Sequence, residues 1–187
     1  MRPHISALAL LRTFRRLAGA ALLCAIVAFG TGALVIVQAG RSDGATGDAA
    51  IVMLADERSS AVRMDRARQL FLDGRVERIL LAGANAVSSR DNLVARGVRE
   101  DAIMALTEPS QTAQLREATD IFERDKLDGG TLIAEPVQTL RLLKIARDAG
   151  VVLNSLPIGA SPEIDLGEVA AEVGQYFRYA LWDANGP

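Results

Sequence analysis

The sequence predicts an α/β fold: a doubly wound, Rossmann-like parallel sheet of about five strands, preceded by one transmembrane helix. The first observation is that short, uninterrupted apolar runs alternate with longer amphipathic segments. The second is that the longer segments have ten or more residues, enough for helices that return the chain to a parallel strand. The third is an uncharged apolar run close to the N-terminus. The crossovers between such strands are expected to be right-handed.

The expected elements follow one another in regular order after residue 48. Apolar runs predict strands at residues 49–54, 78–83, 102–106, 131–134 and 151–156. Amphipathic segments predict helices at residues 60–73, 89–96, 112–127, 137–149 and 165–182. Glycines stand where four of these helices should stop, and they are Gly74, Gly97, Gly129 and Gly150.

For two of the helices the sequence indicates both the N-cap residue and the residues of the buried face. Ser60 is expected to cap the helix at 60–73, and Thr112 to cap the helix at 112–127. The first helix should bury Val62, Ala67, Leu70 and Phe71. The second should bury Leu115, Ala118, Thr119 and Phe122.

The N-terminal run has no charged residue from Leu17 to Gly40, long enough to cross about 30 Å of hydrocarbon. Arginines precede it and no acid lies before it, so the positive-inside rule places the N-terminus in the cytoplasm. The expected organisation is a cytoplasmic basic tail at 1–16, a transmembrane helix at 17–39, a linker at 40–48 and an α/β domain at 49–187. The lipid bilayer is thus an expected partner. A signal peptide cleaved after Ala39 is the open alternative, although its apolar region would be unusually long.

Charge and composition exclude several classes of function. Residues 41–187 hold 17 bases against 23 acids, a formal charge of −6, which argues against nucleic acid as a partner. The single cysteine, Cys24, and the single histidine, His4, both precede the domain. The domain therefore has no disulfide, no Ser-His or Cys-His catalytic pair, and no histidine-ligated metal. No motif in the sequence identifies a cofactor.

The fold class locates the site before any motif is considered, because open α/β sheets bind ligands beyond the carboxyl ends of their strands. The helices that follow also begin there, and their free N–H groups suit an anion. Five segments are expected at this edge, at residues 56–58, 83–85, 107–112, 135–138 and 154–155.

Several short motifs occur in a recognisable order. They are Arg66-Ala67, AGA at 82–84, GVREDAI at 97–103, PSQTAQL at 109–115 and AEPVQTLR at 134–141. This order resembles the SanA/YdcF-like (ElyC-like) family, whose doubly wound domain is often held to the bacterial inner membrane by one N-terminal helix. The resemblance covers essentially the whole domain. It implies a single-pass inner-membrane protein with an extracytoplasmic domain that acts in cell-envelope biogenesis or barrier function.

The chain departs from the family pattern at the places where chemistry is expected. LADE at 54–57 replaces the first glycines, and Gly83 alone remains of the second pair. Gln138 stands at the position of the family's histidine, whereas Arg141 is kept. Glutamine forms hydrogen bonds but carries no exchangeable charge, so the resemblance implies a reduced catalytic motif.

The resulting site hypothesis has two groups of residues. Ligand binding is assigned to Gly83, Asn85, Thr112, Gln138 and Arg141, and possible catalysis to Glu108 and Glu135. No metal site is assigned, although carboxylates near the strand ends, including Asp56 and Glu57, leave a divalent cation as an alternative. Arg141 pairs with an anionic ligand, forms a structural ion pair with Glu135 or lies on a solvated helix face.

Three functions remain open at this stage. The first is a binding protein for an anionic or phosphorylated envelope-related ligand. The second is an enzyme that acts on a phosphorylated or lipid-linked envelope precursor through Glu108 or Glu135 and Arg141. The third is a scaffold that acts through its anchor, in which Ala28 and Gly32 have a small-residue spacing.

Overall fold

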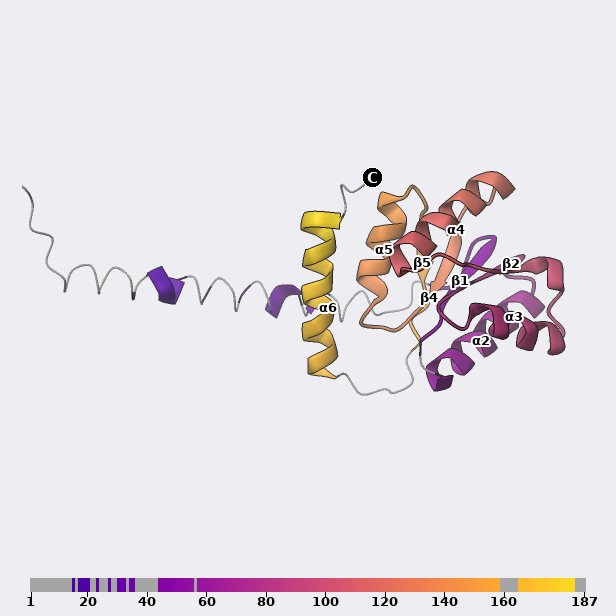
Figure 1. The fold of residues 1–187 in the computed structure, drawn as a ribbon, viewed down its shortest axis with the longest axis horizontal. Coiled ribbons are helices and arrows are strands. Elements are labelled where there is room, and N and C mark those ends of the chain that lie inside the picture. Colours follow the sequence, from indigo (N-terminus) through magenta and orange to yellow (C-terminus); the bar gives the residue numbers. More distant parts are fainter. Residues whose placement is uncertain are drawn as a thin grey trace, which may run out of the picture.

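The sheet is entirely parallel and its strands lie in the order β3-β2-β1-β4-β5 (Figure 1). The computed structural model describes residues 44–55, 57–158 and 165–183, together with residues 15, 17–20, 23, 27, 30–32, 34 and 35. The strands are β1 (Ala49–Met53), β2 (Arg78–Ala82), β3 (Ile103–Ala105), β4 (Gly130–Ile133) and β5 (Leu153–Ser155). Each matches a predicted strand to within two residues at either end, so the predicted five-stranded α/β fold is confirmed.

Helices cover both faces of this sheet. They are α2 (Glu57–Leu72), α3 (Ala86–Ala95), α4 (Gln111–Asp125), α5 (Thr139–Asp148) and α6 (Leu166–Arg178), with a short 3-10 turn at Glu100–Ala102 and a π-helical turn at Tyr179–Asp183. Helices α2 and α3 lie on one face, and α4 and α5 lie on the other (Figure 1). Helix α6 stands at the edge of the domain, next to α5.

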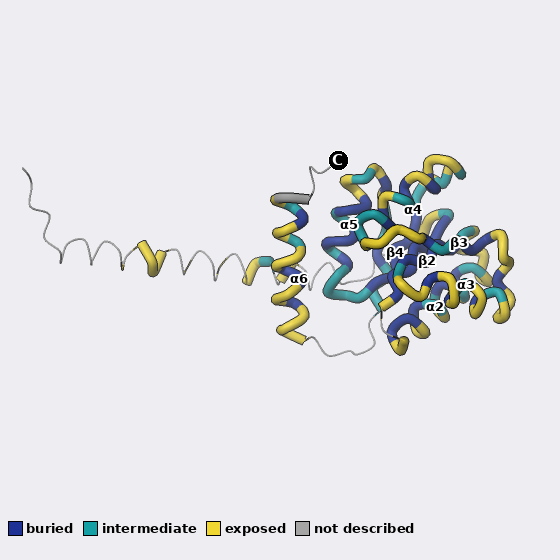
Figure 2. The backbone as a smooth tube through the Cα atoms, in the orientation of Figure 1, coloured by how far each residue is buried: buried dark blue, intermediate teal, exposed yellow. Residues whose placement is uncertain are grey.

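The core forms as two apolar layers because successive side chains of a strand point to opposite faces. In β1, Ile51 and Met53 join the layer beneath α4 and α5. Ala50 and Val52 join the layer beneath α2 and α3. Figure 2 shows the sheet as the buried centre of the domain. A central strand covered on both faces needs apolar residues at every position, which explains the uninterrupted apolar runs in the sequence.

Three helices begin earlier than the sequence suggests. Helix α2 begins at Glu57, so Ser60 lies inside the helix, where its hydroxyl accepts a hydrogen bond from the Ala55 amide at 2.9 Å. Helix α3 begins at Ala86 rather than Ser89. The cap of α4 is Ser110, whose hydroxyl accepts from the Ala113 amide at 3.2 Å. The predicted caps Ser60 and Thr112 are therefore wrong.

The predicted buried faces are confirmed for α4 and partly wrong for α2. Leu115, Ala118, Thr119 and Phe122 of α4 are all buried. In α2, Ala67 and Leu70 are buried, Phe71 is half-buried, and Val62 is 45% exposed. The neighbouring Arg63 takes the buried position instead.

The segment predicted as a linker packs on the domain from Ala45 onward. Ala45 is buried in the layer beneath α2 and α3. The Asp48 carboxylate accepts a hydrogen bond from the Asp128 amide at 2.8 Å. Thr46 accepts from the Thr131 hydroxyl at 2.9 Å and from the Asn154 side chain. Asn154 therefore faces this segment, and its expected place at the ligand-binding edge is wrong.

Most of the predicted transmembrane helix at 17–39, and nearly all of the basic tail, lie outside the described residues. Within the part of the chain that the structure describes, no helix is both long enough and apolar enough to cross a bilayer. The described residues between 15 and 35 are helical and extend away from the domain (Figure 1).

Candidate functional site

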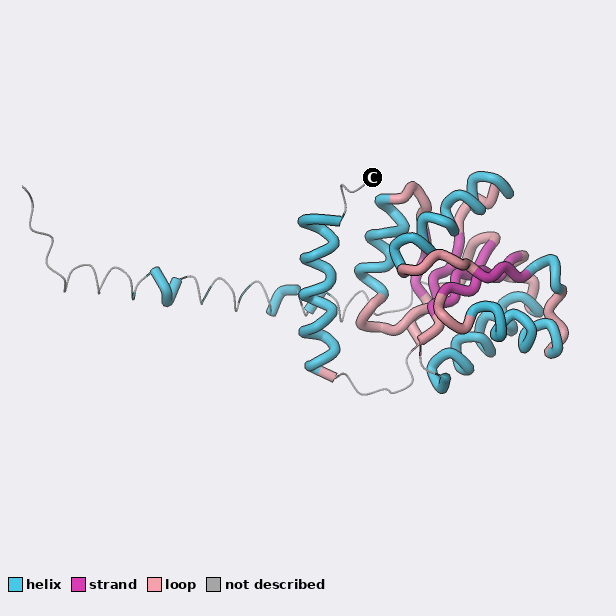
Figure 3. The backbone as a smooth tube through the Cα atoms, viewed as in Figure 1, coloured by secondary structure: helices cyan, strands magenta, loops and turns pink. Residues whose placement is uncertain are grey.

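The order of the strands places the topological switch point between β1 and β4. From β1 the chain first builds outward through β2 and β3, and it then crosses back to place β4 and β5 on the other side of β1. Figure 3 shows the strands of this sheet and the loops that connect them to the helices. In folds of this kind ligands bind beyond the carboxyl ends of the strands, next to the switch point.

The switch point of this protein is filled by one arginine. Arg63 of α2 has an exposed fraction of 0%. Its Nε donates to the backbone oxygen of Ile158 at 2.8 Å, and its Nη1 donates to the backbone oxygen of Met53. Its Nη2 pairs with the Glu135 carboxylate. One guanidinium therefore joins the end of β1, the loop after β4 and the loop after β5.

This arrangement defines the role that Glu135 has in the fold. The residue follows β4 and reaches the carboxyl edge of the sheet, as the sequence predicts, and its side chain is 23% exposed. Its partner is Arg63 and not Arg141, so the alternative of an Arg141–Glu135 pair is wrong. The negative charge of Glu135 neutralises the positive charge of the buried Arg63 guanidinium.

Arg141 is also engaged inside the protein. It lies in the first turn of α5, with a side chain only 8% exposed. Its Nε donates to Glu172 of α6, and its Nη2 donates to Gln111 of α4 at 3.0 Å. Arg141 thus connects three helices. An anionic ligand could pair with the Nε–Nη2 edge of this guanidinium only by displacing Glu172.

An open pocket lies at the ends of β2 and β3. Its volume is about 380 Å³. Its lining consists of Gly83, Ala84, Ala86, Val87, Leu106, Thr107, Glu108, Pro109 and Gln114. Two of the predicted site residues, Gly83 and Glu108, belong to this lining. Thr112, Gln138 and Arg141 do not, so the structure divides the predicted site residues between the pocket and the region around α5.

Gly83 is required by the geometry of this pocket. Its φ of +135° is one that L side chains rarely adopt. A Cβ atom there would lie 2.8 Å from the backbone oxygen of Leu54. The glycine therefore lets the end of β2 approach the loop after β1, and Gly83 itself lines the pocket.

The loop between β3 and α4 is held in place by α4 itself. The amides of Thr107 and Glu108 both donate to the Glu117 carboxylate, at 3.0 and 3.3 Å. The Gln114 side chain donates to the backbone oxygen of Glu108 at 2.8 Å. Sequence reasoning missed Glu117. The only available signal was its position three residues after Gln114, on the same side of the helix.

The remaining wall is the N-terminus of α3. Asn85 occupies the N-cap position, is exposed, and makes no capping hydrogen bond with its side chain. Its backbone oxygen accepts from the Ser88 hydroxyl and from the Ser89 amide. Val87, in the first turn, lines the pocket. The pocket therefore opens onto the positive end of a helix dipole.

The other predicted residues lie nearer to α5. Gln138 occupies the N-cap position of α5, without a capping hydrogen bond from its side chain, and is half-buried. Thr112 is the second residue of α4 and is half-buried. Among the described residues, no three acids, histidines or cysteines lie close enough together to hold a metal ion. Asp56 lies outside the described residues.

Comparison of the chain with known protein families, with curated proteins and with solved structures gives no match.

Proposed function

We propose that this chain is a membrane-anchored, SanA/YdcF-like protein of the bacterial cell envelope whose domain binds an anionic or phosphorylated envelope-related ligand. Its catalytic motif is reduced. One contrast carries the proposal: the charged residues at the β4 end of the sheet are paired with one another, whereas the pocket at the ends of β2 and β3 is open.

Binding is favoured over proton-transfer catalysis by the state of two of the candidate residues. A general acid or base needs a titratable group within reach of the reacting atoms. Glu135 is held by Arg63, and Gln138 stands where the family has its histidine. The only histidine of the chain, His4, precedes the domain.

The composition of the pocket indicates the kind of ligand. Small apolar residues line it together with Thr107 and Gln114, which offer neutral hydrogen-bonding groups. The first turn of α3 offers amide N–H groups and the positive end of a helix dipole. An anionic group of the ligand belongs at α3 and away from Glu108, because like charges repel.

A single substitution pair tests this placement. Val87 lies in the first turn of α3, lines the pocket and is 61% exposed. Val87→Glu places a negative charge where the anion is expected, and Val87→Gln is its neutral control. A glutamate in the first turn of a helix is favourable for folding, so lost function would not reflect an unfolded protein.

The measurement is complementation of the envelope defect of a deletion strain. We expect Val87→Gln to restore the barrier and Val87→Glu to fail, with equal amounts of both variants in the membrane. Full complementation by Val87→Glu would contradict an anion site at α3.

The enzyme alternative rests on Glu108, which lines the same pocket and which, among the described residues, takes part in no ion pair. In that alternative Glu108 or Glu135, with Arg141, acts on a phosphorylated or lipid-linked precursor. Glu108→Gln is expected to complement fully if the protein only binds its ligand. Loss of complementation with normal folding would instead favour catalysis by Glu108.

A further inference from the structure

Helix α6 is attached to the domain by one face only. Val169 and Val173 are buried and contact Val137 and Leu140 near the start of α5. Glu172, on the same face, forms the buried pair with Arg141. An apolar contact combined with a buried ion pair determines which side of α6 points outward, because turning the helix would expose the valines and separate the two charges.

A line of uncharged residues runs along α6 and the turn that continues it, beside the exposed Arg178. Ala170, Gly174, Phe177 and Leu181 follow one another at helical spacing, and all four are exposed. Phe177 is 43% exposed and Leu181 is 63% exposed. Single exposed apolar residues are common on protein surfaces, whereas a line of them along one helix marks a contact surface.

The end of the N-terminal apolar run meets α6. Thr31, Gly32 and Val35 line a cavity of about 310 Å³ together with Leu140, Val173, Tyr176 and Phe177. A Cβ atom at Gly32 would lie 3.6 Å from Cγ1 of Val173. Two segments more than 130 residues apart in the sequence therefore pack together at this edge of the domain.

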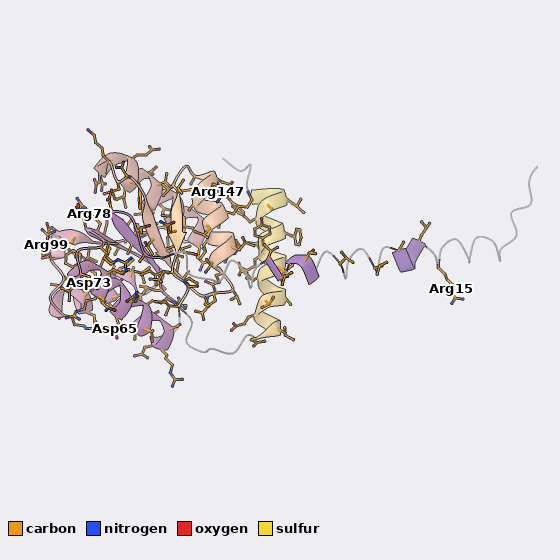
Figure 4. The ribbon with its side chains drawn as sticks, turned by 180° about the vertical axis from the view of Figure 1, so that it is seen from behind. Arg15, Asp65, Asp73, Arg78, Arg99 and Arg147 are labelled. Atoms are coloured by element: carbon orange, nitrogen blue, oxygen red, sulfur yellow. The ribbon has the colours of Figure 1, made fainter. Side chains whose placement is uncertain are left out.

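The direction of the run relative to α6 is visible in two views. In Figure 1 the described residues between 15 and 35 extend away from the domain, and α6 stands across the end of this run that is nearest the domain. In Figure 4, which shows the opposite side, Arg15 lies at the far end of the run. The uncharged run that the sequence shows from Leu17 to Gly40 has the length expected of a segment that crosses about 30 Å of hydrocarbon.

We infer that α6 lies along the surface of the membrane that the N-terminal run crosses, with the line Ala170–Gly174–Phe177–Leu181 in contact with lipid. The inference rests on the proposed anchor, because a helix that stands across the end of a membrane-spanning segment lies along the membrane surface. The contact is apolar, since this line carries no charge and residues 41–187 are acidic overall. Neutral lipid suits it, and the anchor keeps the helix at the surface without basic residues.

The test uses the full chain in vesicles of phosphatidylcholine that contain a nitroxide-labelled lipid as a quencher. Cys24→Ala removes the native thiol. Single cysteines are then introduced by Gly174→Cys on α6, Gly30→Cys in the run and Asp73→Cys at the opposite end of the domain, and each receives a fluorescent label. Side chains at positions 30 and 174 meet open space, so these two changes do not disturb packing.

We expect strong quenching at positions 30 and 174 and little at position 73. Quenching at position 30 with none at position 174 would overturn the inference and leave the proposed anchor intact. Absence of quenching at position 30 would overturn the anchor and the inference together. Disulfide-linked dimers of the unlabelled Gly174→Cys variant, together with absent quenching of the labelled one, would overturn the inference by showing that a second copy covers this face.

Discussion

At the scale of single residues, Arg63 is the side chain on which the carboxyl edge of the sheet depends. Its guanidinium is buried and contacts two backbone oxygens and the Glu135 carboxylate. Removing a charge from water costs several kcal/mol, and the cost is offset only when the charge is paired and its donors are used. The region next to the switch point therefore has a structural role in this protein, because Arg63 holds three chain segments together there.

Arg63→Ala should destabilise the fold by about 3–5 kcal/mol, because it leaves the Glu135 carboxylate without its buried partner. The double variant Arg63→Met with Glu135→Gln should lose less, since no unpaired charge remains. Urea denaturation of the full chain in detergent measures both. Arg66→Ala is the control: among the residues that the structure describes, the Arg66 side chain bonds to Gln69 of its own helix alone, and about 0.5 kcal/mol or less is expected. Equal losses for Arg63→Ala and Arg66→Ala would contradict the assigned role.

Asp148 gives the fold a pH dependence. A hydrogen bond from Lys144 lowers the pKa of this carboxyl, with a smaller contribution from the Tyr179 hydroxyl. Because the folded pKa lies below the unfolded value of about 3.9, the stabilisation is present above that value and is lost as pH falls through the folded pKa.

Asp148→Asn should therefore lower stability at pH 7 by less than about 1 kcal/mol, since the pair is partly exposed. The difference between Asp148→Asn and the unchanged protein should shrink as the pH is lowered below 4. Denaturation curves at several pH values measure it. A difference that stays constant down to pH 2 would show that the ion pair with Lys144 is not its source.

The residue scale is also where sequence reasoning fails most. Arg63 bonds to Ile158, 95 positions away, and no local pattern signals such a contact. The periodicity of α2 instead suggested Val62 as the buried residue. Glu172 escaped notice for the same reason, because its partner Arg141 lies 31 positions earlier on another helix. Polar partners in the core are selected by the assembled fold, and apolar periodicity does not record them.

At the scale of elements, apolar patterns predicted which segments become strands and helices, and turn chemistry decided where each begins. All five strands were located. The signal is strongest for the central strands β1, β2 and β4, because both of their faces are covered and nearly every position is buried. Helix starts were less well predicted, since each contains several residues that can act as a cap. Residues 110–112, at the start of α4, are Ser, Gln and Thr. The extended backbone of Ser110 distinguishes it as the true cap.

The start of α4 permits a direct comparison of prediction and structure. Ser110→Ala should destabilise the protein by about 1 kcal/mol, because the Ala113 amide loses its acceptor. Thr112→Ala should have almost no effect, since this residue is already inside the helix. Thermal or urea denaturation measures both variants. A larger loss for Thr112→Ala would restore the cap expected from the sequence.

At the scale of the whole molecule, the candidate site depends on topology more than on motifs. The strand order brings the predicted segments that follow β2, β3 and β4 to one edge, as the fold class requires. It also separates them, because β2 and β3 form the pocket while β4 lies across the switch point. The motifs could indicate which residues reach this edge. They could not indicate which of them share one cavity, since that depends on side-chain packing between distant segments.

The proposed orientation in the membrane can be tested on whole cells. In a Cys24→Ala background, a thiol at Asp73→Cys should react with a membrane-impermeant maleimide in intact spheroplasts. A thiol at Ser6→Cys, in the basic tail, should react only after lysis. Labelling of position 73 only after lysis would place the domain in the cytoplasm and contradict the proposed function.

The packing of Ala45 to Asp48 on the domain limits the distance between the domain and the proposed anchor. Nine residues separate Val35 from Ala45, and even a fully stretched chain of nine residues reaches only about 30 Å. If the anchor spans the inner membrane, the pocket stays near the lipid headgroups. It then meets solutes close to that membrane and does not reach the outer layers of the envelope. Molecules that dwell on that membrane, or that are released from it, would reach the pocket first.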